Sequence, residues 1–280
     1  LQDQAQKHQI NIINALKRSD YDLVQFRLDE LKKLLQILGE DCLRKVYTEC
    51  TINISKHLNQ QYQFATEMIN RTLAEENGLN EDDVEDYKSY ILRAKAADKV
   101  RKDHLDKTVV ESSGYMQNLK IQLNNMVESI KKKKIDEPSL KRMLDKIKLM
   151  ANRFAETDQH YRNACEVIEY SFVDCAKSFK IYQANEKFED CGNMLTRIQG
   201  SIKLLNDHWD SQDKQKTYEQ LKTDFIDEVK TLTENHYSLF NQPELHDKDI
   251  QKLKEWISKL ESLKNEHALK QHISAEDMEL

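Results

Sequence analysis

The chain has 280 residues, of which 33% are charged and 39% hydrophobic, and its formal net charge at pH 7 is −6. It contains five glycines and two prolines, where average usage would give about twenty and about fourteen. Because sheet proteins need many turn residues, this composition excludes a sheet-rich fold and predicts long helices with few connections. The mild acidity argues against nucleic acid as a partner, and no apolar run is long enough to span a membrane.

The N-terminal part of the sequence is helical in pattern from its first residues. Leu1 is not a start methionine, so we interpret the chain as a fragment of a longer protein. In residues 21–38, apolar residues recur at steps of three and four, as they do on one face of a helix. Ser19 or Asp20 can cap the start of this helix, and Gly39 can stop it.

Further apolar stripes with helical spacing follow along the chain. They run over 47–68, 84–94, 105–130, 140–154, 161–182, 188–209, 218–239 and 253–260. The sequence thus predicts about nine helices, which we expect to pack at shallow crossing angles of about 20°. The predicted fold class is all-α, with tandem long antiparallel helical hairpins stacked into an elongated array.

A spacing of 57 residues recurs along the chain. It separates the members of three sets: Tyr47, His104, Tyr161 and Tyr218; Leu58, Tyr115, Phe172 and Val229; and, with Asn206 as an exception, Leu35, Leu92, Leu149 and Leu263. Several sets at one offset indicate an internal repeat. We therefore interpret 1–280 as a single elongated helical-repeat region, with approximate repeats 14–75, 76–133, 134–184, 185–241 and a partial 242–280.

The sequence lacks the common catalytic, phosphate-binding and metal-binding motifs. It contains no GxxxxGK[ST] loop, GxGxxG loop, GxSxG elbow, CxxC pair or HExxH sequence. We therefore predict no catalytic residue, no cofactor and no metal, and we expect that the chain is not an enzyme. The cysteines are odd in number, and four of the five lie on apolar stripes, so we expect free thiols and an intracellular, cytoplasmic location.

Three histidines stand at positions where a functional role is conceivable. His236 and His246 flank a loop near Asp247 and Asp249, which would suit a metal site, but we favour polar residues at a loop and a helix end. We expect His104 to fill a position between helices with one polar edge in water.

The aromatic residues also allow two interpretations. Tyr47, Tyr161 and Tyr218 either mark a repeated ligand-contact face or lie in the core near hairpin turns, and we favour the core. Trp209 continues an apolar stripe and is predicted to be buried. Trp256 lies on the last predicted helix, whose partner would be outside the fragment, so we expect it to be exposed.

One concentrated basic segment stands out in the sequence SIKKKKIDEPS. We define the basic turn as the following residues: Lys131, Lys132, Lys133, Lys134, Lys141 and Arg142. Lys146 and Lys148 would extend it along the next helix. The lysines either complement the dipole of a helix C-terminus or contact an anionic surface, a phosphoinositide or an acidic protein.

Three functions are compatible with these patterns. We favour a non-enzymatic helical-repeat scaffold or spacer that mediates protein–protein interaction within a larger protein. The alternative is a membrane-associated helical module that binds anionic lipid through its basic patch. A third, an enzyme completed by flanking domains, is disfavoured by the missing motifs. We expect protein partners and no nucleic acid, and the pattern does not fix an oligomeric state.

Overall fold

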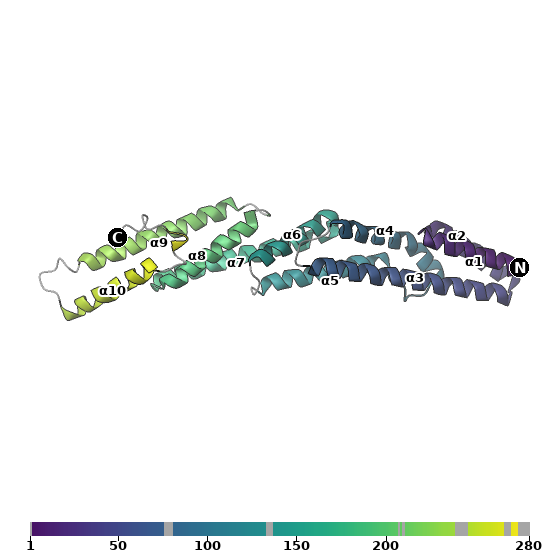
Figure 1. Cartoon of the computed structure of the whole chain (residues 1–280), viewed down its shortest axis with the longest axis horizontal. Helices are drawn as coiled ribbons and strands as arrows, with labels where there is room; N and C mark the ends of the chain where they lie inside the picture. Colours follow the sequence, from purple (N-terminus) through teal and green to yellow (C-terminus); the bar gives the residue numbers. More distant parts are fainter. Residues whose placement is uncertain are drawn as a thin grey trace. The chain divides into compact units, whose positions relative to one another are not determined.

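The computed structural model describes residues 2–75, 81–132, 137–206, 208, 211–238, 246–265 and 270–273. In these residues it contains ten α-helices and a short 3-10 helix but no strand, which confirms the all-α class (Figure 1). The elements are α1 (Gln2–Lys17), α2 (Tyr21–Leu38), α3 (Asp41–Ala74), α4 (Glu81–His104), α5 (Ser112–Lys131), α6 (Glu137–Arg153), η1 (Ala155–Thr157), α7 (Asp158–Ala184), α8 (Phe188–Asn206), α9 (Gln212–Ser238) and α10 (Asp247–Asn265).

The chain divides into two compact units. The first comprises Leu1–Glu128 and Asp145–His160, and the second comprises Ser129–Leu144 and Tyr161–Leu280. The division therefore passes through α5 and α6.

The first unit is built around α1 to α4. Val24, Leu28 and Ile54 are fully buried in its core, as the apolar stripes predict. Asp20 caps α2 by accepting a hydrogen bond from the Leu23 amide at 3.1 Å, so of the two predicted caps the aspartate forms the bond. Gly39 ends the helix with φ +64° and donates its amide to the Leu35 carbonyl at 2.9 Å, as predicted.

The stripe predicted over 105–130 is not one helix. α4 continues to His104, and α5 begins only at Ser112. The Asp98 side chain fixes this start, because it accepts hydrogen bonds from the Ser112 amide at 3.1 Å and from the Ser112 hydroxyl at 2.5 Å. Val109 lies in the connection and is nonetheless buried, since the connection packs on the core of the first unit.

The core of the second unit lies among α7, α8, α9 and α10. Phe179 and Phe188 both contact Phe225, with ring centroids 6.0 Å and 5.7 Å apart. Trp256 is buried, contrary to the expected exposure, because α10 packs beside α9 and places the indole against Phe188. Trp209 lies outside the described residues.

All five cysteines are free, as predicted. Cys42 is half-buried, and the other four are buried in the apolar stripes. Burial raises the pKa of Cys50 to about 11 and that of Cys191 to about 12. These two thiols therefore stay protonated and act as small apolar side chains.

Three tyrosines near helix starts contact histidines that lie later in the chain, at the end of α4, just after α8 and beyond α10. Tyr47 faces His104, Tyr161 faces His208, and Tyr218 faces His272, with ring centroids 6.1, 6.0 and 6.0 Å apart. Each contact joins the start of one helix to a segment that follows a later stretch of the chain. His104 is thus the partner of Tyr47 and not its counterpart in a repeat.

The members of the other two sets differ in how uniformly they are buried. Leu58, Tyr115, Phe172 and Val229 are all buried. In the leucine set, however, Leu92 is 59% exposed and Leu263 only 1%. The repeat length of 57 residues and the proposed repeat boundaries therefore stay predictions.

Candidate functional site

The described part of the basic turn is solvent-exposed. Lys131 ends α5 and Lys132 follows it, while Lys141 and Arg142 lie in the first turns of α6. Arg142 donates a hydrogen bond from Nη2 to the Ser139 hydroxyl at 2.9 Å. Lys133 and Lys134 lie outside the described residues. The exposed cations stand at the end of one helix and the start of the next, where a partner can reach them.

Lys146 does not extend the basic turn, because its side chain is buried in the first unit. Its ammonium group donates to the Leu73 carbonyl at 2.8 Å and also to the carbonyl of Glu75. These carbonyls end α3, where the helix dipole places partial negative charge and the last carbonyls lack partners within the helix. Lys146 therefore caps α3. Lys148, the other residue expected to extend the basic turn, is half-buried.

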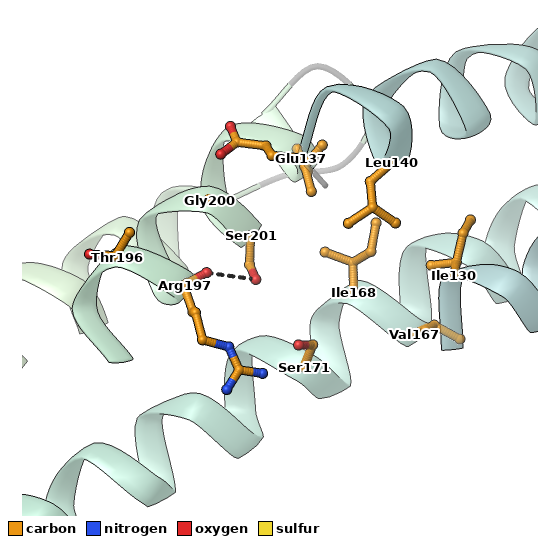
Figure 2. A pocket seen from close by; sticks show the side chains of 11 residues that line it. Ile130, Glu137, Leu140, Val167, Ile168, Ser171, Thr196, Arg197, Gly200 and Ser201 are labelled. Atoms are coloured by element: carbon orange, nitrogen blue, oxygen red, sulfur yellow. Dashed lines mark hydrogen bonds between the residues drawn. The ribbon is translucent and has the colours of Figure 1, made fainter. Parts of the chain in front are cut away.

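A groove with a volume of about 270 Å³ opens beside the basic turn (Figure 2). Four helices of the second unit line it: Ile130 comes from α5, Leu140 from α6, Ile168 from α7 and Leu204 from α8. Leu140 and Ile168 point toward each other across it in Figure 2. The volume exceeds the ~150 Å³ cavity that holds a benzene ring but lies below the ~300–1,000 Å³ typical of small-molecule sites. The groove therefore suits one or two apolar side chains better than a cofactor.

Polar groups of opposite charge stand at two sides of the groove. The Arg197 side chain extends toward Ser171, while the Glu137 carboxylate lies over Gly200 (Figure 2). A Cβ atom added at Gly200 would stand 3.4 Å from the Glu137 carboxylate. Glycine at this helix-interior position therefore leaves the floor of the groove open. The groove therefore has an apolar floor. Its margin is mainly cationic, because the basic turn adds to the charge of Arg197.

A buried polar network surrounds His104 in the first unit. Its side chain is fully buried, so the expected polar edge in water is absent. Nδ1 lies 3.0 Å from the Tyr47 hydroxyl, and Nε2 lies 3.0 Å from the Asp29 carboxylate. Gln25 donates from Nε2 to Asp29 at 3.2 Å and to Asp103 at 3.1 Å. The network connects side chains from α2, α3 and α4.

A hydroxyl, a histidine and a carboxylate in a row resemble a catalytic relay, but here the surroundings favour a structural role. Burial raises the pKa of Tyr47, which disfavours the phenolate. Burial also lowers the pKa of His104, although Asp29 partly opposes this effect. In the second unit Tyr218 again meets a histidine, with its hydroxyl 2.8 Å from Nδ1 of His272. Because the same kind of contact recurs in both units, we interpret it as a structural contact between segments of the chain.

The candidate metal residues do not converge. His236 stacks on Trp256 with ring centroids 4.8 Å apart, and its Nδ1 lies 2.7 Å from the Leu232 carbonyl. The His246 backbone carbonyl accepts hydrogen bonds from the Asp249 and Ile250 amides. Across the described residues, no group of three or more histidine, cysteine or acidic side chains is placed to hold a metal ion.

The sequence patterns do not predict the groove. Its lining residues belong to four helices, and only Ile130, Leu140 and Ile168 among them lie on the apolar stripes. The one local indication is Gly200 inside a helix, where glycine costs about 1 kcal/mol relative to alanine. An unexplained glycine in a strongly helical segment indicates a place where space or close approach is needed.

Compared with protein-family models, with curated proteins and with solved structures, the chain gives no match. None of the described helices combines the length and the apolar character that crossing a bilayer requires. The arrangement of side chains therefore has to support any functional proposal on its own.

Proposed function

We propose that the chain is a non-enzymatic helical scaffold segment that binds a protein partner, with the groove of Figure 2 and the basic turn as its contact surface. The observation that supports this proposal is the open apolar groove beside exposed cations. Ile130 and Leu140 line the groove, and Lys131 and Lys141 directly follow them in sequence. A partner can therefore place an apolar side chain in the groove and acidic groups on the lysines.

The size of the groove supports a protein partner over a small ligand. Protein interfaces are dominated by a few side chains that fill desolvated pockets, with charged groups at the rim. A groove of about 270 Å³ matches such an anchor. The cationic margin would steer an acidic partner and would make association depend on salt.

The experiment is a comparison of captured proteins. Gly200→Leu places a side chain in the groove, and Asn193→Leu places the same side chain on an exposed position of the same helix. A partner should be enriched by the wild-type chain and by Asn193→Leu, but lost with Gly200→Leu, as measured by quantitative mass spectrometry. Circular dichroism checks that both variants are folded. Equal recovery with all three chains, or no enriched protein at all, would refute the proposal.

Binding to anionic lipid is the second candidate, because Lys131, Lys132, Lys141 and Arg142 are all exposed. Clusters of about four to eight basic residues are typical of such binding. Sedimentation with phosphatidylserine vesicles distinguishes the two proposals. Sedimentation that is abolished when Lys131–Lys134 are replaced by glutamate would favour the lipid, and absence of sedimentation would favour the protein partner.

A further inference from the structure

A second groove lies between α7 and α9 in the second unit, and it shares no lining residue with the groove of Figure 2. Its volume is about 620 Å³, within the ~300–1,000 Å³ typical of binding sites. Phe172, Val173 and Ala176 of α7 and Leu221 of α9 form an apolar floor. Phe172 and Leu221 are also buried in the core, so the floor is held by the packing of the unit.

The rim of this groove carries more positive than negative charge. Lys177 and Lys180 of α7 and Lys216 of α9 face one carboxylate, Asp224. In the part of the chain that the structure describes, neither Lys177 nor Lys180 forms an ion pair. Lys216 lies 3.4 Å from the exposed Asp213, a surface pair of the kind that contributes little. The rim can therefore accept negative charge from outside.

The apolar surface continues along α7 beyond the groove. Val173 is 40% exposed, Tyr170 75% and Ile181 61%. These residues are spaced by three and eight positions, which places them on adjoining parts of one helix face. A row of exposed apolar residues beside a groove is typical of a surface that a partner covers.

We propose that this groove, which we call the lysine groove, binds an acidic amphipathic helix of a partner protein. The proposal rests on the proposed scaffold function and assigns a second contact surface with a stated partner chemistry. An amphipathic helix places apolar side chains at steps of three and four into an apolar trough. Acidic residues on its flanks would then meet Lys177 and Lys180 on one wall and Lys216 on the other.

The charges around the groove favour a protein over a membrane. The lysines number fewer than the roughly four to eight that lipid-binding clusters carry. Asp213 and Asp224 stand on the same helix as Lys216 and would face the anionic headgroups. A helix lying in a trough avoids this repulsion, because it can place its acidic residues on the lysines alone.

The test uses the full chain and a synthetic probe. The probe is a fluorescein-labelled peptide of 18 residues with leucines at helical spacing and glutamates on both flanks, and the control peptide has lysines in place of the glutamates. Fluorescence anisotropy should show binding of the acidic peptide at micromolar concentration, weakened at least tenfold when the salt is raised from 50 to 300 mM. The lysine peptide should bind at least tenfold more weakly.

Two variants locate the peptide. Lys177→Glu/Lys180→Glu reverses the charge of one wall of the groove, and Val173→Asp places a charge in its floor. Each of these variants should bind the acidic peptide at least tenfold more weakly than the wild-type chain. Lys95→Glu/Lys99→Glu makes the same charge change at exposed positions of α4 and should leave binding within twofold. Carbodiimide cross-linking should join peptide glutamates to the three rim lysines, as identified by mass spectrometry.

Several results would overturn the proposal. Equal binding of both peptides, or unchanged binding by the rim and floor variants, would exclude the lysine groove as the site. Sedimentation with phosphatidylserine vesicles that the rim reversal abolishes would assign the groove to a membrane. Concentration-dependent self-association that Val173→Asp abolishes would assign it to a second copy of this chain. None of these results bears on Gly200→Leu, which tests the other groove.

Discussion

Replacement of Lys146 by methionine should destabilise the first unit. The ammonium group makes two close hydrogen bonds, to the carbonyls of Leu73 and Glu75, and a third contact with the Thr72 carbonyl at 3.5 Å that contributes little. A hydrogen bond with a charged partner contributes about 1.5–3 kcal/mol, so the two bonds together contribute about 3–6 kcal/mol. Methionine keeps the apolar stem and removes the desolvation cost of the charge, which offsets part of this loss.

We therefore expect Lys146→Met to lower the free energy of unfolding by about 2–4 kcal/mol, which corresponds to a decrease in Tm of about 4–16 °C. Circular dichroism melts measure the decrease, and hydrogen exchange should show lower protection in the last turns of α3. Lys95→Met, at an exposed position of α4, is the matched control and should change Tm little. A loss with Lys146→Met no larger than that of the control would refute the capping role of the ammonium group.

Three further predictions concern other parts of the fold. Gly39→Ala should lower the free energy of unfolding by about 1 kcal/mol, because Gly39 has φ +64°; an unchanged urea midpoint would contradict this. Gly200→Ala should raise the free energy of unfolding by about 0.5–1 kcal/mol, since the added Cβ would stand at an ordinary contact distance from the flexible Glu137 carboxylate. A lower urea midpoint would show that the groove has no room for a Cβ atom at this position. Acidification from about pH 7.5 to about pH 5.5 should destabilise the chain, because burial lowers the pKa values of His57, His104 and His272 in the folded state. Below the pKa of about 6.5 that histidine has in the unfolded chain, the unfolded chain binds more protons than the folded one. The contribution of the three histidines to stability is therefore present above that pH and is lost as the pH falls toward their lowered pKa values. His104→Gln should reduce the slope of Tm against pH, and an equal slope would contradict the assignment.

The sequence predicts which faces of the helices are buried but not which elements meet. Val24, Leu28 and Leu31 lie on a stripe with helical spacing, and all three are fully buried. Lys146 looks like its exposed neighbours Lys141 and Arg142 in the sequence. Its burial depends on the end of α3, more than seventy residues away in the chain. Periodicity contains no information about such a partner, and for the same reason it did not predict the burial of Trp256.

The tyrosine–histidine contacts explain why a fixed spacing is an incomplete description of this chain. The contacts have ring centroid distances of 6.0–6.1 Å, yet the paired residues are 57, 47 and 54 positions apart. The ring geometry is therefore kept, while the lengths of the intervening segments vary. A search at one offset finds His104 because its distance from Tyr47 equals the distance between Tyr161 and Tyr218. The same search misses His208 and His272, which occupy the corresponding place in space.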